Sequence, residues 1–166
     1  MYYSLNTNKC KRKVYIMRAP IQVLVIPYKL VNEIPLYCIF KRNNGDYWQF
    51  VAGGAEDDET PLEAAKRESF EESGIESLNK FYQLVSTFYV PANCISEKCR
   101  QYWDKNVFVI PEYCFAVNIS NNHIELSLEH TEYFWGTYQE VFKKLYWESN
   151  KVALFELNSR IETNLF

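Results

Sequence analysis

Three glutamates, Glu68, Glu71 and Glu72, lie close together in the stretch GGAEDDETPLEAAKRESFEESGI, which covers residues 53–75. In a helix, side chains three and four residues apart lie on one face, so these carboxylates would be neighbours. Their repulsion costs roughly a few tenths of a kcal/mol per pair, and negative charge in the last helical turn adds about 0.3–1 kcal/mol each. A divalent cation turns this repulsion into attraction, because Mg²⁺ and Mn²⁺ prefer oxygen ligands. The spacing therefore indicates a Mg²⁺ or Mn²⁺ site.

A cation held in this way can do chemistry on phosphates. Mg²⁺ keeps several of its waters and recruits phosphate oxygens, so it can activate a water and neutralise charge on a phosphoryl group. Hydrolysis of a phosphate or pyrophosphate bond is the reaction class that fits. The spacing alone leaves a second interpretation open, in which the glutamates form a solvated acidic face that binds nothing.

The residues around the glutamates predict where the helix begins and ends. Thr60 is a candidate N-cap, Pro61 suits the first helical position, and Glu63 completes a capping box with Thr60. Gly74 suits the left-handed exit from the helix. We also expect an ion pair between Glu63 and Arg67, which are four residues apart.

Patterns of apolar and β-branched residues predict the elements that carry this helix. Strands are expected over 19–28, 36–41, 48–51, 81–90, 107–117, 124–128 and 133–135, and further helices over 138–147 and 151–161. This order of strands, helix, strands and helices is typical of an α+β domain or a layered α/β/α domain with a mixed sheet.

The composition limits the class of protein. The chain has 166 residues, 48% of them apolar, and a formal net charge of −3. We expect one domain over 1–166 that binds neither nucleic acid nor an anionic membrane. The N-terminus has a short basic run at 9–13 but no apolar stretch typical of a signal peptide, and no later stretch is long enough to span a bilayer. A cytoplasmic location is expected.

The cysteines predict reduced thiols. Their number is odd, their spacings are scattered and no C-x-x-C motif is present, so a zinc site or a disulfide framework is not indicated. We expect Cys38 and Cys114 to pack in strands. The five cysteines are Cys10, Cys38, Cys94, Cys99 and Cys114.

The wider stretch resembles the Nudix box, G-x5-E-x7-R-E-U-x-E-E-x-G-U, where U is a bulky apolar residue. One position departs from the pattern, because Ser69 stands where the family has an aliphatic residue. The residues in register are Gly53, Glu59, Arg67, Glu68, Glu71, Glu72, Gly74 and Ile75. The resemblance implies a Nudix-like α/β/α sandwich with a mixed β-sheet, in which the box forms a loop–helix–loop against the sheet.

The resemblance also implies a metal centre for Mg²⁺ or Mn²⁺. Glu68 and Glu72 are then the leading ligands and Glu71 a further one. The carbonyl of Ala52, just before the box, is a common additional ligand in the family.

Other residues of the box would shape the loop and the substrate site. Gly53 and Gly54 let backbone approach metal and phosphate closely, so they are expected, with Ala52, among the substrate-binding positions. Arg67 and Glu59 are expected to hold the loop and to orient the glutamates rather than to touch the reacting phosphorus.

Beyond the box, WQFVAGGAEDDE resembles the W-Q-S-V-T-G-S-x-E-E-G-E of bacterial dihydroneopterin triphosphate pyrophosphohydrolases. In that branch a glutamate on a later strand joins the metal site, and Glu112 falls at its place; the alternative is an exposed edge-strand glutamate. Arg18 and Lys41 match basic substrate-contacting positions, although either could be ordinary surface charge. Glu129 and His130 match an E-H-x-x-x-x-W segment, and His130 is expected to be a structural hydrogen-bonding residue.

The resemblance thus implies a Mg²⁺-dependent pyrophosphohydrolase that converts a (deoxy)nucleoside or pterin triphosphate to a monophosphate and pyrophosphate. Glu68, Glu71 and Glu112 are the candidates to take the proton of the attacking water, and the sequence does not choose among them. A diadenosine polyphosphate, an ADP-sugar or an oxidised nucleotide remains an alternative substrate, and a non-catalytic nucleotide sensor an alternative class. We expect a small phosphorylated substrate and a monomer or homodimer.

Two further features bear on the substrate. Aromatic residues expected near the site, Trp48, Tyr102 and Trp103, would stack on a planar ring, although Trp48 could instead pack in the core. Residues 91–106 form a long connection without a regular pattern, and such loops are often functional. We therefore expect either a lid over the substrate or a surface insertion there.

Overall fold

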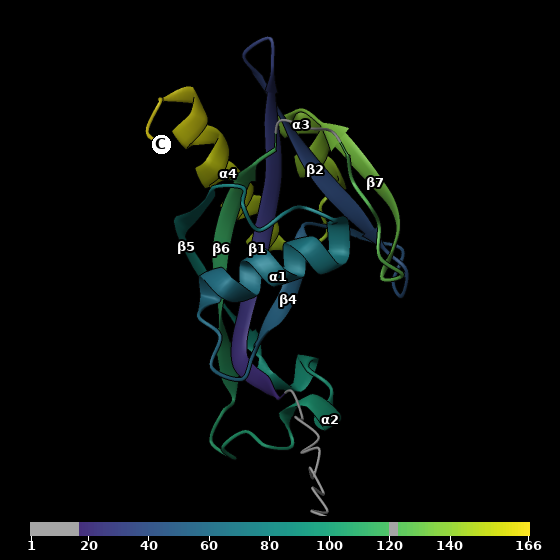
Figure 1. Ribbon diagram of the computed structural model, residues 1–166, viewed down its shortest axis with the longest axis vertical. Coiled ribbons are helices and arrows are strands. Elements are labelled where there is room, and N and C mark those ends of the chain that lie inside the picture. The colour runs from purple at the N-terminus through teal and green to yellow at the C-terminus, as the bar shows by residue number, and fades with distance from the viewer. Residues whose placement is uncertain (1–16, 120–122) are drawn as a thin grey trace, which may run out of the picture.

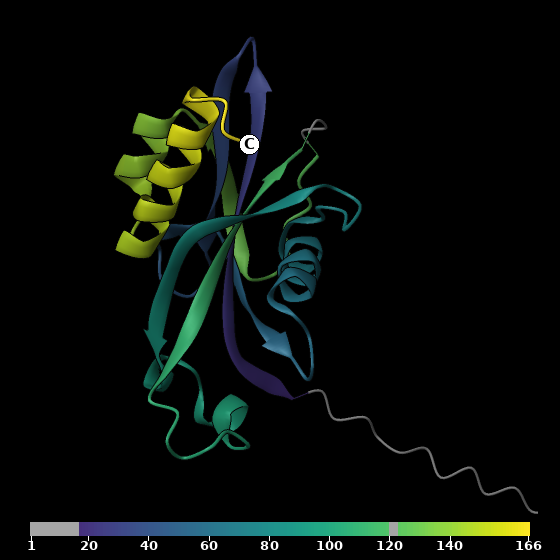
Figure 2. The ribbon, with the colours of Figure 1, turned by 90° about the vertical axis from the view of Figure 1, so that its left-hand side faces the viewer.

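One mixed sheet of seven strands forms the centre of the structure (Figure 1). The computed structural model describes residues 17–119 and 123–166, so the basic run at 9–13 and Cys10 lie outside the described residues. The strand order is β3-β2-β1-β6-β5, with β4 paired to β1 and β7 paired to β2. Helix α1 covers one face of the sheet, and α3 and α4 cover the other (Figure 2). The layered α/β/α architecture with a mixed sheet is therefore confirmed.

Most of the predicted elements are present, with shifted ends. The strands are β1 (Arg18–Val31), β2 (Ile34–Arg42), β3 (Trp48–Gln49), β4 (Val51–Glu56), β5 (Phe81–Pro91), β6 (Val109–Asn118) and β7 (His130–Gly136). The helices are α1 (Pro61–Ser73), the short α2 (Glu97–Arg100), α3 (Tyr138–Lys144) and α4 (Glu148–Glu162), with a 3₁₀ turn η1 at Ala92–Cys94. The strand predicted over 48–51 is interrupted at Phe50 and resumes as β4, which carries the two glycines of the box.

Strand β1 organises the sheet because it has partners along its whole length. It pairs with β4 near its start and with β2 near its end, both antiparallel, and it runs parallel to β6. In this register Gln22 stands between Gly54 of β4 and Glu112 of β6. Residues directly opposite one another in a sheet point to the same face. The sheet therefore places Glu112, which is distant in sequence, one strand away from the box glycine Gly54, with β1 between them.

Two hydrophobic cores fill the space on the two faces. Leu24 and Phe50 pack with Leu154 of α4 on one face, and Val23 and Ala65 of α1 pack on the other. Two of the described cysteines belong to these cores. The four described cysteines, Cys38, Cys94, Cys99 and Cys114, are free, and Cys38 and Cys114 are buried in β2 and β6, as predicted. No helix among the described residues combines the length and the apolar character needed to cross a bilayer.

The strand predicted over 124–128 is wrong. Glu125 N–H donates to the carbonyl of Ser73 (3.0 Å), and Ser127 N–H donates to that of Glu72 (3.2 Å). The last carbonyls of a helix have no partner within the helix, and this segment supplies donors to the end of α1. Its alternating pattern has another origin, because Ile124 is buried against the core on the α1 face.

Residues 91–106 are more regular than expected, since they contain η1 and α2. The segment is tied down at two places. Ala92 N–H donates to the carbonyl of Phe108 (2.9 Å), and the indole N–H of Trp103 donates to the carbonyl of Arg18 (2.6 Å).

A carboxylate of helix α4 binds the sheet where the pairing of β5 and β6 is irregular. The β5–β6 register shifts between Gln83 and Thr87, and the carboxylate of Glu156 accepts the backbone N–H groups of Val85 and Ser86 there, each at 2.7 Å. Burial alone would raise the pKa of Glu156, but these hydrogen bonds, with those from the Ser86 hydroxyl and Arg160, hold it below its ordinary value.

We predict that Glu156→Gln lowers the free energy of unfolding at pH 7 by about 1–3 kcal/mol, because the N–H groups of Val85 and Ser86 and the Ser86 hydroxyl lose a charged acceptor. A pKa below the ordinary value means that the carboxylate stabilises the fold above about pH 4.5, and that this contribution is lost as the pH falls through the folded pKa. Thermal denaturation from pH 7 to about pH 3 measures the effect, and the gap between wild type and variant should narrow as the pH falls below about 4.5.

The matched control is Glu148→Gln on the same helix, since Glu148 is exposed and pairs only with Lys151. An exposed pair of this kind is worth about 1 kcal/mol or less. Equal losses in the two variants, or a gap that widens towards pH 4, would contradict the assignment.

Candidate active site

Helix α1 begins and ends where the sequence predicts. Thr60 and Glu63 form the capping box, with Glu63 N–H donating to the Thr60 hydroxyl and Thr60 N–H to the Glu63 carboxylate. Gly74 ends the helix in the left-handed region with φ 70°. The expected Glu63–Arg67 pair is wrong, because Glu63 is occupied by Thr60 and Arg67 reaches other acceptors. The helix nevertheless presents its glutamates on one stretch of surface, as the spacing predicts.

Arg67 is the centre of the hydrogen-bond network around these glutamates. Its guanidinium donates twice to Glu59, each at 2.9 Å, and once to the carbonyl of Gly54 at 2.7 Å. The same group donates to Glu68 and to Glu71, each at 3.0 Å. The hydrogen bonds from Arg67 lower the pKa of Glu59. Arg67 thus joins the loop before the helix to two of the three helix glutamates.

Glu68 lies directly against the glycines of the box. Its Oε1 accepts the N–H of Gly54 at 3.0 Å, and a Cβ on Gly53 would stand 1.9 Å from its carboxyl carbon. Only glycine therefore permits this approach of carboxylate and backbone. Burial raises the pKa of Glu68 to about 7, although Arg67 opposes the shift.

Glu72 is held from the other side by His130, at the start of β7. Glu72 is 3% exposed, and His130 Nε2 lies 2.9 Å from its Oε2. The Nδ1 atom of His130 is buried without a hydrogen-bond partner in the part of the chain that the structure describes. A proton on Nδ1 would have no acceptor, so the proton is assigned to Nε2, which donates to Glu72. The expected structural role of His130 thus has a geometric basis.

The three carboxylates point to different partners. Glu71 is largely exposed and contacts Arg67, whereas Glu68 contacts Gly54 and Glu72 contacts His130. Within 17–119 and 123–166, no three histidine, cysteine, aspartate or glutamate side chains already converge on a point that a metal could occupy. The donor set still suits a hard divalent cation, because it offers carboxylate oxygens, with Glu72 buried and Glu68 partly buried, and no soft ligand.

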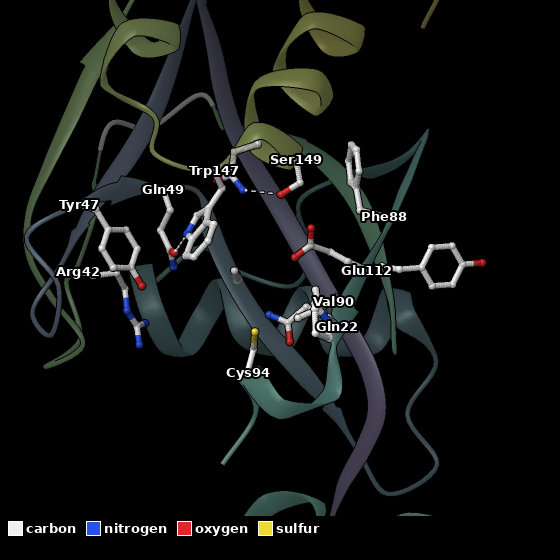
Figure 3. Close-up of a pocket in the computed structure, with 14 residues that line it drawn as sticks. Gln22, Arg42, Tyr47, Gln49, Phe88, Val90, Cys94, Glu112, Trp147 and Ser149 are labelled. Atoms are coloured by element: carbon white, nitrogen blue, oxygen red, sulfur yellow. Dashed lines mark hydrogen bonds between the residues drawn. The ribbon is translucent and has the colours of Figure 1, made fainter. Parts of the chain in front are cut away.

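A cavity of about 410 Å³ opens on the other face of the sheet (Figure 3). Gln22, Ala52 and Glu112 line it from β1, β4 and β6, and Trp147 and Asn150 line it from the start of α4. Its size is that of a small-molecule pocket. The cavity thus adjoins the strand that carries the box glycines.

Glu112 belongs to this cavity. It is 6% exposed, burial raises its pKa, and the Ser149 hydroxyl partly offsets that shift. Figure 3 shows its carboxyl group directed into the space below Ser149. Glu68 instead meets the backbone of Gly53 from the α1 side, so the structure does not bring Glu112 into contact with the helix glutamates.

The basic residues occupy distinct environments. The guanidinium of Arg18 packs on Gly54, where an added Cβ would stand 1.4 Å from its Cζ, and burial lowers its pKa. Lys41 is on the surface, where its ammonium contacts Asp46 (2.8 Å) and Glu132 (3.2 Å).

Arg42, which the sequence did not single out, lines the cavity, and its Nη1 lies 3.9 Å from Glu72 Oε1. Neighbouring residues of a strand point to opposite faces, which separates Lys41 from Arg42. When the register of a strand is unknown, two adjacent basic residues do not show which of them faces the site.

The aromatic residues of the cavity are also not those expected. Trp48 packs against the core and under Lys144, Tyr102 is 66% exposed, and Trp103 binds the Arg18 carbonyl. The aromatic side chains that line the cavity are Tyr47, Phe88, Tyr89 and Trp147. Trp147 comes from the far end of the chain, and only the tertiary fold brings it to the cavity.

A model of the family described as the NUDIX domain matches residues 23–157, which is most of the chain. The chain belongs to the Nudix family. The resemblance carried by the box is therefore confirmed, and Nudix hydrolases generally use divalent cations and act on small phosphorylated substrates.

Individual Nudix proteins resemble the chain to different degrees. A putative Nudix hydrolase from Listeria monocytogenes is 40% identical, covers 88% of this chain and 97% of its own, and superposes with a TM-score of 0.79. The dihydroneopterin triphosphate pyrophosphohydrolase of E. coli is 24% identical, with coverages of 87% and 99% and a TM-score of 0.68. The latter likeness concerns the fold.

A curated relative matches only a short stretch. An RNA pyrophosphohydrolase from Bartonella bacilliformis is 44% identical over 41 residues, which are 25% of this chain and 24% of that protein. The match therefore spans about a quarter of the relative's length.

We predict that His130→Leu lowers the free energy of unfolding by about 1–3 kcal/mol in metal-free buffer, because the buried carboxylate of Glu72 loses its donor. His130→Gln keeps an N–H donor and should lose less. Thermal denaturation of both variants measures the difference.

A double-mutant cycle with Glu72→Gln isolates the contact. A coupling energy of at least about 0.5 kcal/mol is expected for two residues in one hydrogen-bonded pair. Strictly additive losses would show that His130 acts through its packing against Phe40 alone.

Proposed function

We propose that this Nudix protein is a Mg²⁺-dependent pyrophosphohydrolase that cleaves a (deoxy)nucleoside or pterin triphosphate to a monophosphate and pyrophosphate. The observation that carries the proposal is the contact of Glu68 with the Gly53–Gly54 backbone. It brings a partly buried carboxylate to one side of a strand whose other side borders the cavity through Ala52. The proposal places the organic group of the substrate in the cavity and its phosphates beside β4, where the metal site would form.

The residues that would hold the cation are Glu68, Glu71 and Glu72, with the carbonyl of Ala52 and, from the cavity side, Glu112. A bound Mg²⁺ or Mn²⁺ supplies charge neutralisation and Lewis acidity for attack of a water on phosphorus. The carboxylates would have to turn away from their present partners towards a shared ion. A divalent cation attracts a carboxylate more strongly than these partners do.

The chain's own groups can orient the phosphates and take up the proton. Arg42 lines the cavity and pairs with Glu129 through Nη1. Arg18 lies over Gly54 and donates to Gln22 through Nη2. Each guanidinium has further N–H groups that can donate to phosphate oxygens. Lys41 could do so only by leaving its carboxylate partners. Glu68, Glu71 and Glu112 remain the candidates for the proton acceptor.

Residues 91–106 are proposed to act as a cover for the substrate. Pro91 and Cys94 line the cavity, and Trp103 ties the segment to β1. Such segments exclude water from the reacting bond. A cytoplasmic location is part of the proposal and agrees with the four free cysteines.

A panel of substrates tests the reaction directly. Dihydroneopterin triphosphate, dATP, 8-oxo-dGTP, ADP-ribose and diadenosine tetraphosphate are compared at equal concentration with Mg²⁺, and pyrophosphate and orthophosphate are measured separately. Turnover of a triphosphate with release of pyrophosphate is expected. Tenfold faster turnover of either of the last two would reject the substrate class, and binding of a nucleotide without any turnover would favour a sensor.

We predict that Glu72→Gln lowers kcat by at least about 10²-fold, equivalent to roughly 2.7 kcal/mol in the barrier at 1.36 kcal/mol per decade. The amide keeps the shape of the side chain but not the charge that a cation needs. The Mg²⁺-dependent rise in melting temperature should shrink in parallel, because binding to the folded state alone stabilises it.

The matched control is Glu76→Gln, an exposed glutamate just beyond the helix, which should behave as wild type in both measurements. Activity of Glu72→Gln within threefold of wild type, or an unchanged Mg²⁺ shift, would remove Glu72 from the metal site.

A further inference from the structure

Three amide side chains line the cavity, and the oxygen of each accepts a hydrogen bond from another group of the protein. The Oε1 of Gln22 accepts a hydrogen bond from Arg18, and the Oε1 of Gln49 accepts the indole N–H of Trp147 at 3.2 Å. The Oδ1 of Asn150 accepts the backbone N–H of Phe50 at 3.0 Å. The same arrangement therefore occurs on β1, on β3 and at the start of α4.

These partners determine which way each amide points. The oxygen and nitrogen of an amide are normally assigned from the hydrogen-bond network. A guanidinium, an indole N–H and a backbone N–H can only donate, so each must meet the amide oxygen and not the NH₂ group. Each oxygen has one of its two lone pairs occupied in this way, so the NH₂ group is the part of the amide that is most available to a ligand.

The cavity therefore offers mostly donors on this side. Arg42, which also lines it, has donors only. Of the three NH₂ groups, that of Asn150 has a long contact of 3.4 Å with the Ser149 hydroxyl, which occupies one of its two hydrogens. A ligand that fits must present acceptors, such as carbonyl oxygens and ring nitrogens, to these groups.

The other residues of the cavity favour a ring over a phosphate group. Trp147 and Phe88 supply apolar surface, and Glu112 places a carboxyl group in the same space. Without a cation between them, a phosphate and the carboxylate of Glu112 would repel each other. A neutral planar ring can instead lie against the aromatic surface.

We propose that the cavity selects a planar heterocycle that carries a ring carbonyl, as 6-oxopurines and 4-oxopteridines do, over a 6-aminopurine. An amino group in place of the carbonyl would set donor against donor and leave a buried NH₂ unpaired, which costs at least about tenfold in affinity. This inference rests on the proposed function for the position of the phosphates, and it adds the chemical class of the organic group.

Gln49 is the residue proposed to determine this choice. It is 7% exposed, and the bond to the Trp147 indole fixes its amide. Trp147 itself packs edge-on to Tyr47 and Tyr146, with ring centroids 5.7 and 4.8 Å away. The indole N–H of Trp147 therefore orients the amide of Gln49, and the ring contacts with Tyr47 and Tyr146 support the position of the indole.

Equilibrium binding tests the proposal without hydrolysis. The dissociation constants of IMP, GMP and AMP are measured without metal, with inosine, adenosine and inorganic phosphate as further probes. IMP and GMP should bind within about threefold of each other and at least tenfold tighter than AMP. Equal binding of IMP and AMP would overturn the proposal, as would binding of phosphate with no binding of either nucleoside.

Gln49→Glu gives a sharper test, because a carboxylate can still accept from Trp147 while its second oxygen accepts instead of donating. The ratio of IMP to AMP affinity should fall at least tenfold. Gln139→Glu, an exposed position on α3, is the matched control and should leave the ratio unchanged. An unchanged ratio in a folded Gln49→Glu protein would remove Gln49 from this role, and the wild-type ratio decides the matter if the variant does not fold.

The two proposals fail separately. Preference for IMP over AMP in a protein that hydrolyses no triphosphate would reject the pyrophosphohydrolase and keep the oxo-ring site. Hydrolysis of triphosphates with no preference between inosine and adenosine would do the reverse.

Discussion

The mutual repulsion of carboxylates on one helix is the constraint on which the rest of the site depends. Arg67 reduces it with a guanidinium that meets Glu59, Glu68, Glu71 and the carbonyl of Gly54 at once. The cost is not removed, since burial still raises the pKa of Glu68. Glu72 depends on a different partner, His130 from β7. The protein therefore keeps negative charge concentrated at the end of α1 by tying it to the loop before the helix and to a strand beyond it. That is the arrangement expected of a site whose missing charge comes from a cation.

The sheet links this charged end to the cavity. Gln22 of β1 lies in register between Gly54 of β4 and Glu112 of β6, so three adjacent strands fix the distance from the box to Glu112 in the cavity. Alternation along β4 then sends neighbouring positions to opposite faces: Ala52 borders the cavity, whereas Gly53 meets Glu68. Under the proposed function, the organic group of the substrate would lie in the cavity on the α4 side and the metal site on the α1 side, where glycine at position 53 leaves room for the carboxylate of Glu68.

Local signals predicted the helix of the box well. Thr60, Pro61 and Gly74 act through neighbours in sequence, and the family pattern depends on spacing within one helix. Features that depend on tertiary pairing were not predicted. The alternation over 124–128 indicated a strand, but its N–H groups bind the end of α1. Lys41 and Arg42 could not be told apart without the register of β2, and the amides of the cavity acquire a direction only through partners such as Trp147.

The central claim is that the glutamates of α1 hold a divalent cation next to the box glycines. Crystals grown with Mn²⁺ test it most directly, because the anomalous scattering of manganese locates the ion independently of the surrounding atoms. The expected result is an anomalous peak coordinated by carboxylate oxygens of Glu68 and Glu72 and close to the carbonyl of Ala52. An ordered protein with no peak at the end of α1, at a Mn²⁺ concentration that saturates activity, would contradict the account.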